Sequence, residues 1–132
     1  MKLGFVFLCC MLYANAQIQN IPLPNLKKAT NYTLYKNIAL QFGKFPKRVK
    51  PKQQGIIASK MSNHILKDSK HICTMLFYSA LKDLQEQALN AGSNKIGNIT
   101  SYLDNKSKPL SKHFQCEIGT IFSIVTLRAD IY

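Results

Sequence analysis

The clearest pattern of apolar and polar positions in this chain lies in residues 68–92. Its apolar side chains recur at steps of three and four residues, as on one face of a helix: Cys73, Phe77, Ala80, Leu81, Leu84 and Ala88. Asp68 or Ser69 can cap the N-terminus, and Gly92 supplies the glycine that commonly ends a helix. The pattern predicts one amphipathic helix whose apolar stripe, Cys73 included, faces a sheet.

Four further segments have the composition of strands. Residues 34–42 carry alternating apolar side chains, residues 54–60 form a second short run, and the two together predict a hairpin with a long connection. Residues 94–103 and 113–128 follow the helix as two more strands, separated by a polar connector. The order strand, strand, helix, strand, strand (ββαββ) predicts an α+β fold, with one amphipathic helix packed on a small antiparallel or mixed sheet.

The last of these segments is apolar on both faces. Its two predicted faces consist of Cys116, Ile118, Phe122 and Ile124 on one side and of Ile121, Val125 and Leu127 on the other. Gly119 is expected to mark a bulge. A strand of this kind is usually central and covered twice, whereas one helix covers only one face. We therefore expect the N-terminal leader or a second copy of the chain to cover the other face.

The first sixteen residues have the pattern of a secretory signal peptide. Lys2 gives the positive start, residues 3–13 are an unbroken apolar run, and Ala14 and Ala16 form a small-x-small cleavage site. A membrane anchor is the alternative, but a bilayer core requires about 20 apolar residues. The pattern predicts cleavage after Ala16 and no transmembrane segment in the remaining chain.

The mature chain is predicted to be one domain with a short leader. Residues 17–31 contain two prolines and several asparagines, which favour an extended leader. Residues 32–132 are enough for a single α+β domain and too few for two.

Signal cleavage removes Cys9 and Cys10 and leaves Cys73 and Cys116. An exported chain meets an oxidising compartment, where two cysteines permit one bridge. The sequence therefore predicts a Cys73–Cys116 disulfide. Two buried thiols that never meet are the alternative.

Basic residues outnumber acidic ones by 18 to 6, so the formal net charge is +12, or +11 without the signal peptide. The densest stretch, "KFPKRVKPK", carries a basic surface formed by Lys44, Lys47, Arg48, Lys50 and Lys52. Such a field attracts polyanions, which outside the cytoplasm include phosphorylated lipids and acidic glycans. A loop that only keeps the protein soluble is the competing interpretation.

Two stretches of the sequence resemble a family of small exported bacterial proteins, often labelled "excinuclease ATPase subunit-like". They are "CTMLFYSALKDLQEQALNAGSNKIGNITSYL" and "FQCEIGTIFSIVTL". The matching positions are Cys73, Ala80, Leu81, Leu84, Gly92, Asn94, Ile99, Ser101, Tyr102, Cys116 and Gly119, with Phe42, Gly43 and Pro46 upstream. The family is in turn similar to YbjQ-type domains and to the outer-membrane lipoprotein RcsF.

The resemblance implies a helix-start cysteine bridged to the last strands, and no enzymatic activity. Lys95 departs from the family pattern, which has a small apolar residue there, and so does "TIFSIV" in place of small residues. An excinuclease role would require a G-x-x-x-x-G-K-[ST] phosphate-binding loop, which the sequence does not contain.

The one constellation with metal-ligating residue types is His71, Cys73, His113 and Cys116. Helical spacing separates residues 71 and 73 by about 200°, and residues 113 and 116 of a strand face opposite sides. Metal ligation by His71 and His113 therefore stays the weaker alternative, and no cofactor is predicted. A cysteine–histidine nucleophile would require a free thiol, which conflicts with the bridge.

These observations predict an exported, non-enzymatic protein of the interaction or binding type, either periplasmic or secreted. A metal- or small-ligand-binding module is the alternative function. The expected partners are an envelope protein, an anionic lipid or glycan surface, or a second copy of the chain, and not a specific nucleic acid.

Overall fold

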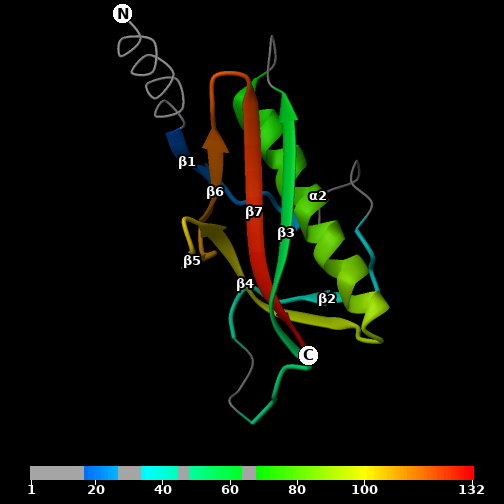
Figure 1. Ribbon diagram of the computed structural model, residues 1–132. Coiled ribbons are helices and arrows are strands. Elements are labelled where there is room, and N and C mark those ends of the chain that lie inside the picture. The colour runs from blue at the N-terminus through cyan, green and yellow to red at the C-terminus, as the bar shows by residue number, and fades with distance from the viewer. Residues whose placement is uncertain (1–16, 27–33, 45–47, 64–67) are drawn as a thin grey trace, which may run out of the picture.

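The computed structural model describes residues 17–26, 34–44, 48–63 and 68–132, and one helix covers one face of its mixed sheet (Figure 1). The predicted signal peptide, residues 1–16, lies outside the described residues. The helix is α2 (Ser69–Asn90). Seven strands form the sheet: β1 (Gln17–Pro22), β2 (Ala39–Leu40), β3 (Gln53–Asn63), β4 (Lys95–Leu103), β5 (Lys106–Pro109), β6 (His113–Ile118) and β7 (Phe122–Ile131). The α+β class is confirmed, but the sheet is larger than predicted and does not follow the ββαββ order.

Helix α2 begins and ends close to where the sequence predicts. The Asp68 carboxylate accepts a hydrogen bond from the Lys70 backbone N–H at 3.1 Å, which makes Asp68 the N-cap. At the other end Gly92 has φ +72°, and the Ser93 N–H donates to the Ala88 carbonyl at 2.8 Å. This is the left-handed glycine termination that the sequence indicates. No helix in the described part of the chain is long and apolar enough to cross a membrane.

The predicted hairpin between the first two strands is wrong. β3 pairs antiparallel with β7 along its length, whereas β2 pairs parallel with β4 through only two residues. Residues 34–42 form so short a strand because Gln85 of the helix hydrogen-bonds the backbone of Tyr35 and Ile38. A side chain therefore provides there the hydrogen bonds that a neighbouring strand would have provided.

The predicted last strand is two strands. Gly119 lies in the turn between β6 and β7, where its N–H donates to the Phe122 carbonyl at 2.8 Å, so the predicted bulge is a hairpin turn. The turn also changes which positions face inward. The buried side chains are Phe114 and Cys116 before it, and Ser123, Val125, Leu127, Ala129 and Ile131 after it. The predicted grouping of Ile124 with Cys116 is therefore wrong.

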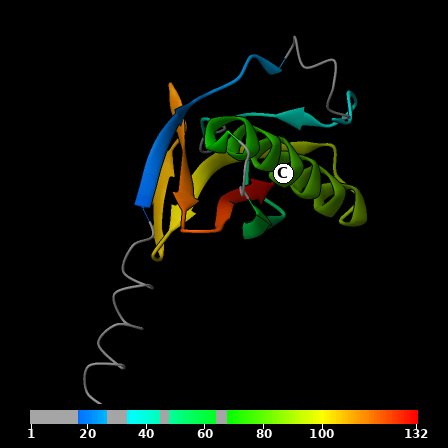
Figure 2. The same ribbon diagram turned by 90° about the horizontal axis from the view of Figure 1, so that it is seen from above.

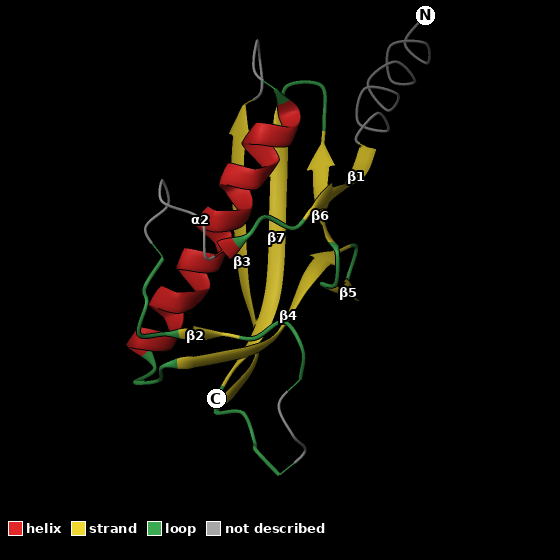
Figure 3. Ribbon diagram, turned by 180° about the vertical axis from the view of Figure 1, so that it is seen from behind, coloured by secondary structure: helices red, strands yellow, loops and turns green. Residues whose placement is uncertain are grey.

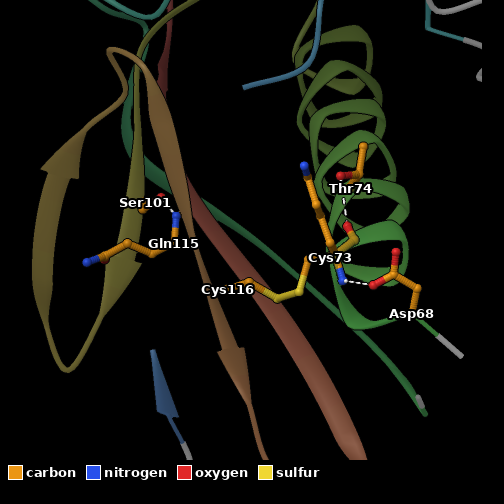
Figure 4. The surroundings of a disulfide bond; sticks show 7 residues. Asp68, Cys73, Thr74, Ser101, Gln115 and Cys116 are labelled. Atoms are coloured by element: carbon orange, nitrogen blue, oxygen red, sulfur yellow. Dashed lines mark hydrogen bonds between the residues drawn. A yellow bond between two sulfur atoms is a disulfide. The ribbon is translucent and has the colours of Figure 1, made fainter. Parts of the chain in front are cut away.

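The polar connector at 104–112 contains β5, which forms a hairpin with β4. Asp104 and Asn105 have φ values of 51° and 59°, and two such residues in sequence form the two-residue turn that matches strand twist. β6 leaves β7 after a short pairing and runs beside β4, where the Gln115 N–H donates to the buried Ser101 hydroxyl at 2.9 Å (Figure 4).

The leader extends the sheet and does not cover its second face. β1 pairs antiparallel with β6 and forms the edge of the sheet on that side, as the view from above shows (Figure 2). The face opposite α2 therefore leaves large apolar side chains exposed, with Met61 61% and Phe122 47% accessible. Of the two predicted coverings, the leader is excluded for residues 17–22, and an oligomer stays a prediction.

The core lies between α2 and the inner face of β3, β4 and β7, with the helix crossing that face obliquely (Figure 3). Phe77 of the helix stacks on Phe114 of β6, with ring centroids 4.4 Å apart. One turn before Phe77, Cys73 forms the predicted disulfide with Cys116, and both residues are fully buried (Figure 4). The disulfide and the ring pair together attach the start of the helix to β6, next to the leader strand.

Candidate anion-binding cleft

Two β-bulges lie opposite each other across the C-terminal half of β7. The register of β3 shifts between Gln53 and Ile56, and that of β4 shifts between Gly97 and Thr100. In both cases the neighbouring strand has one extra residue opposite residues 128–131 of β7. Bulges commonly redirect side chains next to functional sites, and this end of the sheet carries two of them.

Asp130 joins the two bulges. Its carboxylate accepts the Gly55 backbone N–H at 2.9 Å from the β3 side and the Asn98 side-chain amide at 3.2 Å from the β4 side. Gly55 and Asn98 have φ values of 68° and 52°, the left-handed region in which glycine and asparagine are the residues most often found. The Asp130 carboxylate thereby satisfies the backbone N–H of one bulge and a side-chain amide of the other.

Arg128 lies two residues before Asp130, on the same outer face of β7. Its guanidinium carbon is 5.3 Å from the centre of the Tyr102 ring. On another side it approaches Gly55 so closely that a Cβ there would lie 2.8 Å from Nη2. A guanidinium in a cation–π contact can still direct its N–H donors to an acceptor such as a phosphate or a carboxylate.

A cavity of about 450 Å³ opens beside this arginine. Its walls include Lys44, Gln54, Thr100, Ser107, Arg128 and Tyr132. Two cationic side chains and several neutral donors therefore surround a space of the size that small-molecule sites have. Lys44 is placed there because the Gly43 carbonyl, next to it in the chain, accepts the Asn98 N–H at 2.9 Å.

A second hollow, of about 550 Å³, adjoins the first. The two share Val49 and Tyr132 in their walls, and Lys52 and Lys95 line the second one. Backbone hydrogen bonds hold this region together, since the Lys52 N–H donates to Ile131 at 2.6 Å and the Tyr132 N–H donates to Lys95 at 3.0 Å. The hollow is therefore built between the end of the basic loop and the beginning of β4.

The Tyr132 phenol, in the shared wall, is neutral at physiological pH. Burial raises its pKa above the usual value, and the negative charge of Asp130 raises the pKa further. The phenol itself therefore adds no negative charge to the cleft.

The predicted basic surface divides at this site. Lys44 and Lys52 line the two cavities, whereas Arg48 and Lys50 are exposed and line neither of them. Lys47 lies outside the described residues. The cleft thus draws its positive charge from the basic loop, β4 and β7, through Lys44, Lys52, Lys95 and Arg128.

Sequence reasoning missed Arg128 and both bulges. Arg128 is one charge at the end of an apolar strand and carries no motif. A weak signal was present in Gly55 and Asn98, because a glycine or asparagine inside a strand often marks a bulge.

The alternative metal site does not assemble as a four-ligand set. Cys73 and Cys116 are bonded to each other and cannot act as thiolate ligands, while His71 and His113 are exposed. Within residues 17–26, 34–44, 48–63 and 68–132, no group of three or more histidine, cysteine, aspartate or glutamate side chains could hold a metal ion.

Comparisons of this chain with protein-family models, with curated proteins and with solved structures give no match. The resemblance to small exported bacterial proteins stays a prediction. The function is therefore argued from the cleft.

Gly55 provides a direct test of how the cleft is built. A Gly55→Ala substitution should lower the free energy of unfolding by about 1–2 kcal/mol, because alanine is strained at positive φ and its Cβ would displace Arg128. Urea unfolding measures the change. Gly43→Ala is the matched control, since a Cβ at residue 43 meets no atom within 4 Å, and its effect should stay within about 0.5 kcal/mol. Equal effects of the two substitutions would contradict the role assigned to Gly55.

Proposed function

We propose that this chain is an exported, non-enzymatic binding protein that holds an anionic group in the cleft beside Arg128. The observation that carries the proposal is a guanidinium fixed between Tyr102 and Gly55 at the wall of an open cavity. Fixing the side chain in advance reduces the conformational entropy that binding would otherwise cost. The neighbouring lysines add electrostatic attraction for the anion but do not fix its orientation.

The charge balance of the cleft supports an anion as the ligand. Asp130 is the acidic residue in its wall, and both of its oxygens already accept hydrogen bonds from Gly55 and Asn98. Among the side chains of the wall, Lys44 and Arg128 therefore act on a ligand against one acidic side chain whose charge is partly compensated. Arginine suits this role because its planar fork matches the oxygens of phosphate, sulfate and carboxylate groups.

Export is part of the proposal. The signal-peptide pattern of residues 1–16 and the Cys73–Cys116 disulfide both favour an oxidising compartment, which is the periplasm or the exterior. Ligands with anionic groups in those places include lipid headgroups and acidic glycans, in agreement with the partners expected from the sequence.

Pyrophosphate binding, measured by calorimetry at low salt, tests the proposal. Arg128→Gln should weaken binding about tenfold or more, because hydrogen bonds to charged groups contribute about 1.5–3 kcal/mol. Arg128→Lys, which keeps the charge and loses the fork, should give an intermediate affinity. Thermal unfolding of each variant confirms that the fold is kept.

Arg48→Gln is the matched control. It removes the same charge from an exposed arginine in the basic loop that lines neither cavity. The affinity of this variant should fall by less than about twofold, because Arg48 lines neither cavity and would not contact a ligand held there. If Arg48→Gln and Arg128→Gln weaken binding equally, diffuse charge explains it and the proposed site is wrong.

A further inference from the structure

The second hollow differs in character from the cavity at Arg128. Val49 and Leu89 line it, and these two side chains are 40% and 45% exposed although they come from the basic loop and from the helix. A single exposed leucine is ordinary in a protein surface. Two exposed aliphatic side chains from distant segments that line one hollow, directly beside a cationic cavity, are a more specific arrangement.

The cations of this hollow suit a ligand with both apolar and charged parts. Lys52 and Lys95 line it together with Val49 and Leu89. Lysine stems lie along apolar surface while their ammonium groups stay in water, so these residues extend the apolar wall and keep positive charge near the entrance.

We infer that the ligand of the cleft is a single amphiphilic anion, with its anionic group at Arg128 and its apolar chain or ring over Leu89 and Val49. The inference rests on the proposed function and names the class of ligand. Val49 and Tyr132 belong to both walls, so the two hollows lie side by side and one elongated molecule could occupy both. The volumes of about 450 and 550 Å³ each match the size of small-molecule sites.

In such a cleft, each of the two cavities would recognise a different part of the ligand. The arginine fork would fix the headgroup by hydrogen bonds, and the apolar walls would add affinity in proportion to the apolar area that they cover. A purely inorganic anion would use the first cavity alone. An uncharged amphiphile would lose the interaction with Arg128.

A series of alkyl phosphates separates these contributions. Methyl, butyl and octyl phosphate, each below its micelle-forming concentration, are titrated into the full mature chain by calorimetry. Octyl phosphate should bind at least about tenfold more tightly than methyl phosphate, because each fully covered methylene raises affinity about fourfold and covering only two of them is enough for that difference. Octyl glucoside, which has the same chain and no charge, should bind more weakly than octyl phosphate.

Substitutions in each cavity show which side chains contribute to binding the alkyl chain and which to binding the phosphate. Leu89→Gln should remove most of the advantage of octyl over methyl phosphate and leave methyl phosphate binding unchanged. The Leu89 side chain is 45% exposed and does not belong to the buried core, so the fold should be kept. Val49→Ser, in another segment, provides a second test of the same wall. Arg128→Gln should weaken the three alkyl phosphates by the same factor.

The outcomes distinguish this inference from the function on which it rests. Equal affinity for methyl and octyl phosphate overturns the amphiphile and leaves the anion site standing. Absence of binding to every phosphate overturns both. Binding to vesicles of anionic phospholipid that is unaffected by Leu89→Gln and Val49→Ser assigns the partner to a membrane surface and also overturns the inference.

Discussion

Removal of the Cys73–Cys116 disulfide is expected to lower the free energy of unfolding by about 4 kcal/mol, from the chain-entropy cost of a loop of this length. The bridge joins residues 43 positions apart and links the first turn of α2 to β6. In the unfolded chain it restricts nearly the whole helix and the two strands that follow. A small domain has a small core, so a loss of this size is a large share of its stability.

The effect is measured by urea unfolding of the oxidised protein with and without reductant. The Cys73→Ala/Cys116→Ala double variant is the control, since it should resemble the reduced protein and show no response to reductant. The alanine pair also leaves a small cavity at a fully buried position, so it should be no more stable than the reduced form. If reductant leaves the midpoint of the natural protein unchanged, the bridge does not stabilise the fold as described.

Replacement of Gln85 by leucine should destabilise the protein by about 3 kcal/mol. The Gln85 side chain is 1% exposed and makes three hydrogen bonds to backbone groups of Tyr35 and Ile38, at 2.8, 3.0 and 3.0 Å. Leucine leaves those groups without their partner, at about 1 kcal/mol for each lost bond. The segment that leads into β2 would then lose its attachment to the helix.

Gln87→Leu is the matched control for this substitution. Gln87 lies two positions further along the helix and makes one exposed hydrogen bond, to the Ile57 carbonyl at 3.0 Å, so its loss should cost less than about 1 kcal/mol. Hydrogen exchange adds a local readout, because the amides of Ala39 and Gln41 donate to the carbonyls of Asn94 and Ile96 and should lose protection in Gln85→Leu alone. Similar losses in both variants would show that Gln85 has no special role.

Elements with local signals could be predicted from the sequence. The helix followed from its apolar periodicity and from Asp68 and Gly92, and its structure confirms both ends to within two residues. β3 and β4 followed from short apolar runs. The disulfide could be predicted because cleavage of the signal peptide would leave two cysteines, and the structure confirms the pair.

Pairings that depend on distant side chains could not be predicted. The short length of β2 reflects Gln85, which lies 47 positions after Ile38. The split of the last strand depends on the turn at Gly119, which a run of apolar residues conceals.

In the cleft, too, the features with a local sequence signal could be predicted and those that depend on distant residues could not. Lys44 and Lys52 were visible as a run of charge, but Arg128 acquires its role from Gly55 and Tyr102, which reach it from two other strands. The bulges that create this geometry depend on one carboxylate, that of Asp130, bonding to both neighbours at once. No local pattern encodes such a coincidence.

Chemical-shift mapping of the ¹⁵N-labelled protein during titration with inorganic phosphate tests the anion site most directly. The account predicts saturable shifts centred on the amides of Gly55, Asn98 and Thr100 and on the Arg128 side chain, all of which vanish in Arg128→Gln. Shifts that never saturate and are centred on the exposed Arg48 and Lys50 would mean that phosphate only accumulates around a positively charged loop. That result would contradict an anion-binding site in the cleft.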